Sequence, residues 1–310
     1  MSDLLLLFPG QGSQKPGMAK DLAESYPAAR AVWEAADEAL GARLSAIAFA
    51  GPADELTLTH NAQPALLVHG AAVWAVAGAQ ARSRVKAAAG HSLGEFTAYH
   101  AAGSLGLADA VRLVRRRGEL MFEAGVAQPG AMAAILGQLG APVEAICRQA
   151  SEAGTVVPAN YNAPEQTVIS GEVAGVERAM DLAKAAGAKR VVRLNVSGAF
   201  HSPLMAPAAP GLEAALATPA WSDPAWPVWS NVTAGAVADA GAARRLLLQQ
   251  LTSPVRWVEV IRSMASAYPE ATFVEMGPGN VLAGLVKRLA PGHQVRTCGT
   301  VAEVEALLAA

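Results

Sequence analysis

Short apolar runs alternate with alanine-rich stretches of helical periodicity through residue 124, and the same pattern returns from about residue 228 to the end. The apolar runs at residues 4–7 and 85–89 predict two strands. Strands that alternate with amphipathic helices are typical of an α/β fold, in which helices cover a parallel sheet. We therefore predict one discontinuous core domain, made of residues 1–126 and 200–310.

The segment between these two stretches, residues 127–199, follows a different order. Its pattern predicts a strand, a helix, two strands, a helix and a final strand, over residues 131–136, 142–153, 156–160, 167–170, 173–186 and 190–196. This βαββαβ order is that of a ferredoxin-like unit. Glycines and prolines within residues 125–130 predict a hinge at its entry, and Gly198 with Pro203 marks its exit. We expect a substrate cleft between the two subdomains.

A G-x-S-x-G pentad, Gly90-His91-Ser92-Leu93-Gly94, directly follows the predicted strand at residues 85–89. A helix-compatible stretch, residues 93–102, comes next. A glycine-flanked turn between a strand and a helix exposes its serine as a nucleophile. The pentad therefore predicts that Ser92 is a catalytic nucleophile.

Two further segments strengthen this interpretation. One is the glycine-rich turn Phe-Pro-Gly-Gln-Gly-Ser-Gln at residues 8–14, and the other is Ser-Gly-Ala-Phe-His-Ser-Pro-Leu-Met at residues 197–205. Together with residues 90–95 they resemble the malonyl-CoA:acyl carrier protein transacylases, whose pattern is a GQGSQ loop, a GHSLGE elbow and a GAFHS-type histidine segment. The resemblance runs nearly end to end and also takes in residues 61–65, Arg117-Gly118, Asn160, 250–255 and 275–279.

This resemblance implies a hydrolase-like α/β core with an inserted ferredoxin-like subdomain. It also implies an activity, the transfer of a malonyl group from malonyl-CoA to the phosphopantetheine thiol of acyl carrier protein. Such a reaction supplies the elongation of fatty acid or polyketide chains.

A serine hydroxyl needs a histidine within hydrogen-bond reach to accept its proton. The resemblance implies His201 in this role. An alternative is His293, because hydrolases of similar fold place the triad histidine near the C-terminus. The other histidines have simpler explanations: packing for His60, His69 and His100, and support of the elbow for His91, which we expect to point away from Ser92.

No acidic residue is the obvious partner for the second ring nitrogen of His201. The resemblance implies a backbone carbonyl in the loop at Gln250, whose side chain would otherwise only end a helix. The tetrahedral intermediate needs preorganised donors for its negative oxygen. The backbone N–H of Leu93, directly after the nucleophile, is one such donor. The resemblance implies the N–H of Gln11 as the second, in a segment that is otherwise an ordinary glycine turn.

Arg117 is distinguished by its helical spacing within a predicted helix over residues 107–123. Its neighbours three and four positions away are all apolar, namely Leu113, Val114, Leu120 and Met121. The other arginines of this helix share a separate, solvated face with Glu119. A buried arginine requires an anionic partner. That partner is either a structural Asp or Glu or, as the resemblance implies, the malonyl carboxylate, which a guanidinium binds in a bidentate fork.

Four more positions are candidate substrate contacts. Phe200 is either a core aromatic or a wall beside the α-carbon of the acyl group, and in related acyltransferases a phenylalanine here accompanies malonyl rather than branched units. Met121 would line the same pocket. Gln63 matches a position that lines the cleft in the family, and Asn160 either lies near the site or closes a strand end through its side chain.

The composition limits the function classes. The chain has 310 residues, of which 52% are hydrophobic, and a formal net charge of −2, so no general field favours nucleic acid or an anionic membrane. Cys147 and Cys298 form no spaced cluster and suggest neither a zinc site nor a disulfide framework, so a reduced cytoplasmic setting fits best. We expect no membrane span, because no apolar stretch approaches the necessary length, and no export signal. We also expect a monomer without metal or redox cofactor.

A local basic patch should receive the acidic carrier protein. Its candidates, each of which is otherwise a solubilising surface charge, are Lys189, Arg190, Lys287 and Arg288. Three other functions share parts of these motifs. A serine esterase or thioesterase would let water complete the reaction, a silent scaffold would keep only the fold, and a close relative would serve malonate decarboxylation or polyketide assembly. Ser92, His201 and Arg117 together favour the transferase.

Overall fold

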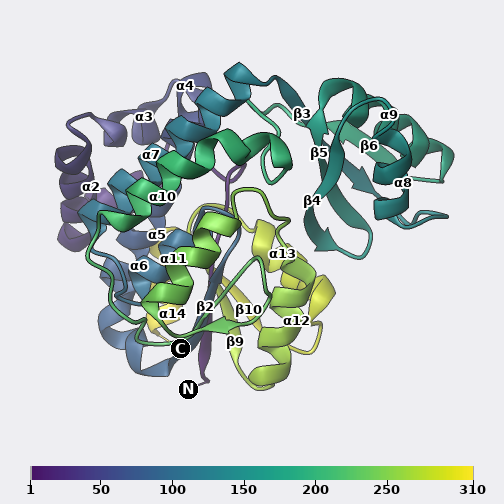
Figure 1. The fold of residues 1–310 in the computed structure, drawn as a ribbon. Coiled ribbons are helices and arrows are strands. Elements are labelled where there is room, and N and C mark those ends of the chain that lie inside the picture. The colour runs from purple at the N-terminus through teal and green to yellow at the C-terminus, as the bar shows by residue number, and fades with distance from the viewer. Residues whose placement is uncertain (1, 310) are drawn as a thin grey trace.

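Two separate sheets organise the chain in the computed structural model, which describes residues 2–309 (Figure 1). The larger sheet has the strand order β10-β9-β1-β2-β7-β8. Its strands are β1 (Leu4–Phe8), β2 (Val85–Gly90), β7 (Val228–Trp229), β8 (Ala236–Val237), β9 (Thr272–Met276) and β10 (Val295–Cys298). All neighbouring strands run parallel except β8, which pairs antiparallel with β7. The strands predicted at residues 4–7 and 85–89 are confirmed and lie side by side in this sheet.

Helices cover both faces of the larger sheet. Because β1 lies inside the sheet, all five of its residues are buried, and alternate side chains enter two different hydrophobic clusters. The larger cluster is built with α1 (Lys20–Ser25), α2 (Pro27–Leu40), α3 (Leu44–Ala50), α4 (Ala53–Thr57), α5 (Thr59–Ala81), α6 (Gly94–Ala101), α7 (Leu107–Ala127), α10 (Ala209–Ala217), α11 (Ala240–Gln249) and α14 (Val301–Leu308). The second cluster is closed by α12 (Trp257–Ala267) and α13 (Val281–Leu289). Short 3-10 helices occur at Arg82–Arg84 and Pro203–Ala208.

Helix α5 corrects one expectation from the sequence. Together with the turn after it, Thr59–Arg84, it is long and apolar enough to cross a membrane by length and composition. In the fold, however, 83% of its most apolar window is buried, and α5 packs against α2, α6 and α7. The prediction that no apolar stretch approaches the length of a membrane span is therefore wrong, because a helix that is mostly covered by protein needs no continuous polar face.

The smaller sheet belongs to the inserted segment and has the order β4-β5-β3-β6, with all neighbouring strands antiparallel. Its elements are β3 (Gly130–Leu136), α8 (Val143–Ala150), β4 (Val156–Ala163), β5 (Gln166–Glu172), α9 (Val173–Ala185) and β6 (Arg190–Arg193). The two helices and the sheet enclose a hydrophobic cluster of their own, and Figure 1 shows this unit beside the larger one. The predicted βαββαβ order and ferredoxin-like arrangement are confirmed. The domain boundaries at residues 127 and 199 stay a prediction.

Three strands of the smaller subdomain end elsewhere than predicted, and one of them is β5, which continues to Glu172 rather than to residue 170. Strand β6 ends at Arg193 rather than at residue 196, although the N–H of Leu194 still donates to the carbonyl of Met132 in β3 at 2.8 Å. Strand β4 continues to Ala163 rather than residue 160. Its last part contacts the larger subdomain, since the N–H of Tyr161 donates to the carbonyl of Val255 at 2.9 Å. The end of β4 is thus one place where the two subdomains are joined by backbone hydrogen bonds.

The predicted hinge at the entry is partly helical. Helix α7 runs to Ala127, so Gly125 lies inside it rather than in a loop. An added Cβ at Gly125 would stand 2.2 Å from the carbonyl oxygen of Ser197. Gly125 therefore permits the close approach of two backbone segments, and the hinge prediction is wrong at this residue.

Candidate active site

A cavity of about 400 Å³ opens beyond the C-terminal ends of β1 and β2. Its walls come from both subdomains, since Met132 and Asn160 of the smaller sheet take part. All predicted site residues except Gln250 line it, namely Gln11, Gln63, Ser92, Leu93, Arg117, Met121, Asn160, Phe200 and His201. The expected cleft between the subdomains is thus present, and it gathers residues that are far apart in the sequence.

The elbow at Ser92 follows β2 and leads directly into α6. Ser92 has a φ of 53°, in the left-handed region that a serine rarely adopts. Gly90 and Gly94 make the turn possible: an added Cβ on Gly90 would stand 1.8 Å from the carbonyl carbon of Gly94, and one on Gly94 would stand 2.1 Å from the carbonyl oxygen of Phe8. The two glycines of the pentad are therefore steric requirements of the elbow.

Ser92 and His201 form a hydrogen-bonded pair. The Oγ of Ser92 lies 2.8 Å from Nε2 of His201. The other ring nitrogen, Nδ1, lies 2.9 Å from the carbonyl oxygen of Gln250 and 3.2 Å from that of Ser253. Carbonyl oxygens only accept hydrogen bonds, so Nδ1 carries the proton and Nε2 is free to accept the proton of Ser92. The orienting group is a backbone carbonyl at Gln250, as predicted.

The electrostatic surroundings keep His201 neutral. Burial lowers the pKa of His201 to about 3, and the positive charge of Arg117 adds to the effect, against the opposing hydrogen bonds to the two carbonyls. A neutral imidazole can act as a general base, whereas an imidazolium cannot. The pair is therefore in the protonation state that proton transfer from Ser92 requires.

The alternative base, His293, lies elsewhere. Its Nε2 is 3.2 Å from the carbonyl oxygen of Tyr268, and its ring packs against Phe273 of β9. Three other histidines pack within the core domain as expected: His69 bonds the carbonyl of Gly299, His100 that of Leu105, and His60 packs against Phe122. None of these residues lines the cavity of Ser92.

His91 supports the elbow, as predicted. Its Nε2 lies 2.8 Å from the Oδ1 of Asn162, a residue of β4, so it connects the elbow with the smaller subdomain. His91 also lines the cavity, and we expected it to point away from Ser92. Its ring makes no hydrogen bond to Ser92 among the described residues. His91 therefore lines the cavity wall and connects the elbow to β4 of the smaller subdomain.

Two backbone N–H groups remain available at the cavity. Within residues 2–309, neither the amide of Gln11 nor that of Leu93 donates a hydrogen bond. Both residues line the cavity beside Ser92. The side chain of Gln11 is held in place, because its Oε1 accepts from Thr59 at 2.9 Å. These free donors are what an oxyanion requires, and their role stays a prediction.

Arg117 is 1% exposed and lies beside the nucleophile. Its Nη1 donates to Oε1 of Gln63 at 2.6 Å, and its Nη2 donates to Oε1 of Gln250 at 3.0 Å and to Oγ of Ser92 at 3.2 Å. The guanidinium carbon lies 5.4 Å from the ring centroid of Phe96. Burial lowers the pKa of Arg117 to about 10, so the group remains a cation at neutral pH.

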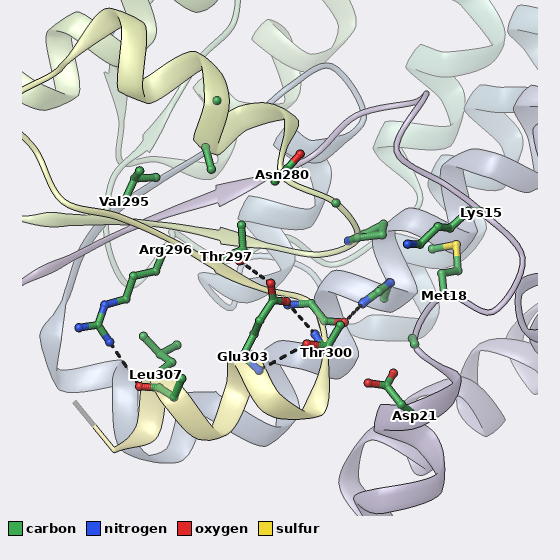
Figure 2. A pocket seen from close by; sticks show the side chains of 18 of the residues that line it. Lys15, Met18, Asp21, Asn280, Val295, Arg296, Thr297, Thr300, Glu303 and Leu307 are labelled. Atoms are coloured by element: carbon green, nitrogen blue, oxygen red, sulfur yellow. Dashed lines mark hydrogen bonds between the residues drawn. The ribbon is translucent and has the colours of Figure 1, made fainter.

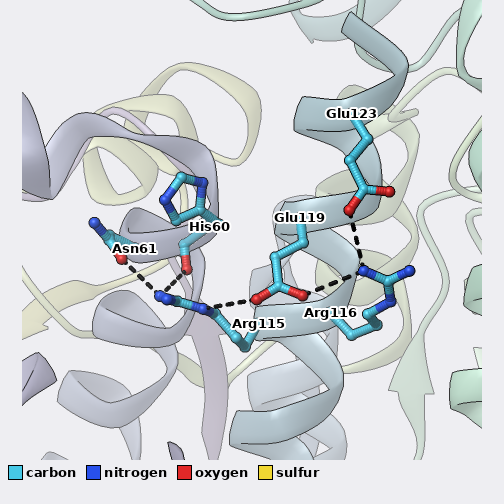
Figure 3. A network of polar contacts seen from close by, with 6 residues as sticks. All are labelled: His60, Asn61, Arg115, Arg116, Glu119 and Glu123. Carbon is cyan, nitrogen blue, oxygen red and sulfur yellow. Dashed lines mark hydrogen bonds and ion pairs between the residues drawn. The ribbon is translucent and has the colours of Figure 1, made fainter. Parts of the chain in front are cut away.

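No carboxylate of the described residues forms an ion pair with Arg117. The nearest buried acid, Glu95, raises the pKa of Arg117 from a distance, with the amide of Gln250 between them. The alternative of a direct structural ion pair is therefore not what the structure shows. The predicted solvated face of α7 is present instead on its other side, where Arg115 and Arg116 both pair with Glu119 (Figure 3). Figure 3 also shows Arg115 reaching the first turn of α5.

The remaining candidates form the walls. Gln63 donates from Nε2 to Thr59 at 3.0 Å and to the sulfur of Met121 at 3.5 Å. Phe200 is 6% exposed and borders the cavity. Asn160 pairs through its backbone with Val255, and within the described part of the chain its side chain makes no hydrogen bond, so it is free to face a ligand.

Sequence reasoning missed two residues of the site. Asn231 accepts the N–H of Ser92 on its Oδ1 at 2.7 Å and donates from Nδ2 to the carbonyl of Gly90 at 2.8 Å, so its side chain spans the elbow. Glu95 is completely buried and accepts from Gln250. The available signals were their positions, since Asn231 follows a strand end near β2 and Glu95 closes the glycine-serine motif.

The larger hollow of the molecule lies elsewhere. It measures about 1120 Å³ and is lined by residues of β10, α13 and α14 (Figure 2). Two of its charged side chains are occupied by neighbouring groups: Glu303 accepts from Thr297 and from the N–H groups of Gly299 and Thr300, and Arg296 donates to the carbonyl of Ala306. It contains no serine–histidine pair. Among residues 2–309, no group of three or more His, Cys, Asp or Glu side chains could hold a metal ion.

The chain matches the acyl transferase domain family over residues 5–305. It is 48% identical over 290 residues to the malonyl CoA-acyl carrier protein transacylase of Bacillus subtilis, covering 93% of this chain and 91% of that protein. The chain belongs to the malonyl CoA-acyl carrier protein transacylase family.

Solved structures of this family have the same fold. The acyl-carrier-protein S-malonyltransferase of Bartonella henselae superposes with a TM-score of 0.95 at 45% identity, over 99% of this chain and 98% of that one. A malonyl-transacylase solved in complex with a type II PKS acyl-carrier protein superposes with a TM-score of 0.94 at 38% identity, over 99% of both chains. The transacylase fold therefore extends over essentially the whole chain.

Proposed function

We propose that this protein transfers the malonyl group from malonyl-CoA to the phosphopantetheine thiol of an acyl carrier protein, through a malonyl ester on Ser92. The observation that carries the proposal is the buried guanidinium of Arg117, whose Nη2 lies 3.2 Å from Ser92 Oγ. A cation beside the nucleophile suits an acyl group that itself ends in a carboxylate. The names of the relatives support the same donor and acceptor.

In the first half-reaction, Oγ of Ser92 attacks the thioester carbonyl while Nε2 of His201 accepts the hydroxyl proton. The N–H groups of Gln11 and Leu93 donate to the oxygen of the tetrahedral intermediate. The C–S bond then breaks, and His201 returns the proton to the sulfur of coenzyme A. The malonyl ester stays on Ser92.

In the second half-reaction, His201 accepts the proton of the phosphopantetheine thiol, and the sulfur attacks the ester carbonyl. The C–O bond breaks, and the proton passes from His201 to Oγ of Ser92. The scheme balances without a metal or redox cofactor, because it moves only an acyl group and a proton. Both half-reactions use the same base and the same oxyanion donors.

Arg117 selects the acyl group in this proposal. Its guanidinium binds the free carboxylate of malonate in a bidentate fork, with Gln63 and Gln250 holding it in place. Phe200 and Met121 border the space beside the α-carbon. A ring at this place disfavours an added methyl group by roughly 1–3 kcal/mol, so discrimination against methylmalonate is partial.

The carrier protein requires a surface of its own. We assign it to the basic residues Lys189, Arg190, Lys287 and Arg288, although Arg288 also pairs with Glu165 at 3.3 Å. Reversing the charges of Lys189 and Arg190 should raise KM for the carrier protein at low salt. Unchanged kinetics would remove this patch from the proposal. We further propose a monomer in the cytoplasm, serving fatty acid or polyketide elongation, without a nucleic acid or membrane partner.

Intact-mass analysis tests the activity. The purified protein is exposed briefly to malonyl-CoA and then mixed with phosphopantetheinylated carrier protein. A malonyl adduct that forms on the wild type, is absent in Ser92→Ala and moves to the carrier is the expected result. Rapid loss of the adduct as free malonate would instead favour a hydrolase, and the absence of any adduct would favour a silent scaffold.

A further inference from the structure

The buried carboxyl group of Glu95 lies behind the catalytic residues Ser92 and His201. Glu95 belongs to the first turn of α6 and is 0% exposed. Its Oε2 accepts two hydrogen bonds, from the backbone N–H of Asn231 at 3.0 Å and from Nε2 of Gln250 at 2.7 Å. Its Oε1 has no partner among the described residues. A buried ionisable group is costly, so its retention here calls for an explanation.

The first bond leads to the nucleophile. The backbone of Asn231 is fixed by Glu95, and the side chain of Asn231 bridges Gly90 and Ser92 across the elbow. Ser92 holds a left-handed φ of 53°, which the surrounding bonds must maintain. The side chain of Glu95 therefore acts on the elbow from behind, through Asn231, while its backbone N–H donates to the carbonyl of Ser92 at 3.0 Å.

The second bond leads to the arginine and the base. The Nε2 of Gln250 donates to Glu95 and, at 3.1 Å, to the carbonyl of Ser92. The Oε1 of the same amide accepts from Arg117 at 3.0 Å, and the backbone carbonyl of Gln250 accepts from His201. One glutamine thus contacts the nucleophile, the base and the arginine.

The orientation of the Gln250 amide is the decisive point. The Oε2 of Glu95 already accepts the backbone N–H of Asn231 and can only accept from Gln250 as well, so it requires the NH₂ group of Gln250 to face it. The amide oxygen must then face Arg117. Without the carboxylate, the Ser92 carbonyl at 3.1 Å is the one remaining acceptor for this NH₂ group among the described residues, so the amide could turn by half a rotation and present its NH₂ group to the guanidinium, which itself only donates. Arg117 would lose one of its two amide acceptors and its fixed position.

We propose that Glu95 is a positioning residue for acyl selection, which orients the Gln250 amide so that Arg117 stands ready to receive the carboxylate of the acyl donor. This inference rests on the proposed function of Arg117. It predicts that the loss of Glu95 weakens the reaction of a donor with a carboxylate more than that of a donor without one. A role in folding alone would weaken both donors equally.

The test compares malonyl-CoA with acetyl-CoA as donors. The rate of Ser92 acylation is measured by rapid-quench intact mass in wild type, Glu95→Gln and Glu95→Ala, with the folded fraction of each variant measured by near-UV circular dichroism. In Glu95→Ala we expect the malonyl-to-acetyl rate ratio to fall roughly 10- to 100-fold, the range for the loss of one hydrogen bond to a charged group. Glu95→Gln can accept through its amide oxygen and place its NH₂ at the unpartnered Oε1 position, so its ratio should fall less, by about 3-fold or more.

Tyr99→Phe is the matched control. Tyr99 lies on the same helix, is fully buried, and within the described residues its hydroxyl has no hydrogen-bond partner. Its replacement should leave the malonyl-to-acetyl ratio unchanged. If Glu95→Ala does not fold, Glu95→Gln carries the test alone.

Two results must be kept apart. If both Glu95 variants keep the wild-type ratio, or lose both activities in parallel with the folded fraction, the positioning role is wrong while the transacylase proposal stands. If the wild type itself forms no malonyl adduct, the proposed function fails first. A ratio that falls in the Glu95 variants but not in Tyr99→Phe supports the inference.

Discussion

The Nη2 atom of Arg117 lies 3.2 Å from the Oγ of Ser92, so the buried cation and the nucleophile are in direct contact. A carboxylate that enters the cavity would compete with Ser92 for one N–H group of Nη2, while Gln250 keeps the other. Binding of a malonyl group would therefore draw the guanidinium away from the serine oxygen and leave its lone pairs free for attack.

Arg117→Met should separate acyl donors by their charge. Methionine fills similar space without N–H groups, so kcat/KM for malonyl-CoA should fall roughly 100-fold or more, as expected for the loss of a buried charge partner. The value for acetyl-CoA should fall less, because no carboxylate is involved. Steady-state kinetics with both donors measures the ratio. Arg115→Met, on the solvated face of the same helix, is the control and should leave the ratio as in the wild type.

Asn231→Ala should slow both donors alike. It removes the acceptor for the Ser92 N–H and the donor for the Gly90 carbonyl, so the strained elbow loses its side-chain bridge. We expect kcat to fall about 10-fold and the free energy of unfolding to fall by about 1–3 kcal/mol, the cost of buried polar groups left unpaired. Urea unfolding and kinetics with both donors measure these effects. Asn280→Ala, at a helix end without a side-chain cap, should change neither quantity.

The sequence allowed the elbow, the ferredoxin-like insertion and Arg117 to be predicted, because each has a local signature. Gly90 is required by a contact within the turn itself, and the burial of Arg117 follows from helical spacing. Asn231 has no such signature, and Glu95 stands in the elbow motif without any local sign of the partners that it binds. Glu95 and Asn231 meet across 136 positions of the chain, and that contact exists only once β7 pairs with β2.

The same difference explains the errors about elements. Helix α5 is apolar on all sides because its neighbours come from several distant helices, which periodicity alone does not reveal. Gly125 was expected to be a hinge, but its function depends on the approach of Ser197, which is far along the chain. Local sequence patterns were enough to locate Ser92 and Arg117. The contacts that hold these residues in place join distant parts of the chain and could not be predicted from local patterns.

The acid limb of the pH profile, where kcat/KM falls at low pH, should lie far below the pKa of an ordinary histidine. Because burial and Arg117 lower the pKa of His201 from 6.5 to about 3, the base is neutral above that pH, and activity is lost only as the pH falls toward it. We expect the limb below about pH 5. In Arg117→Met the limb should move upward, because a positive charge beside the imidazole is gone.

Other titrating groups near His201 must be accounted for in this profile. His91 is also buried, and burial raises the pKa of Glu95 to about 7. The profile is therefore measured in Glu95→Gln as well, in which the limb of His201 should persist. A limb near pH 6.5 in both proteins would contradict the assignment of a buried, neutral base.

Gly90→Ala should prevent the elbow from forming. The added Cβ would overlap the backbone of Gly94 at 1.8 Å, and backbone atoms at the start of a helix cannot move aside cheaply. We expect loss of soluble, folded protein or loss of Ser92 acylation. Gly284→Ala is the control, since nothing lies within 4 Å of an added Cβ in α13, and it should raise stability by about 0.5–1 kcal/mol. An active Gly90→Ala protein would contradict this account of the turn.

Glu95 should make stability depend on pH. Burial raises its pKa from 4.5 to about 7, so the folded state binds the proton more tightly than the unfolded state. The stability linked to Glu95 is therefore fully present below pH 4.5 and is lost as the pH rises through 7. The difference between these two values, at ~1.4 kcal/mol per pK unit, corresponds to ~3 kcal/mol.

Urea unfolding between pH 5 and pH 8 tests this prediction. Over that range the wild type should lose ~2 kcal/mol or more relative to Glu95→Gln, which has no group to ionise at this position. Glu119→Gln, which changes a carboxylate on the solvated face of α7, should follow the wild type. If wild type and Glu95→Gln lose stability in parallel, ionisation of Glu95 does not destabilise the folded state. The prediction would then be wrong, and Gln250, Asn231 and Arg117 would have to stabilise the ionised carboxylate enough to offset its burial.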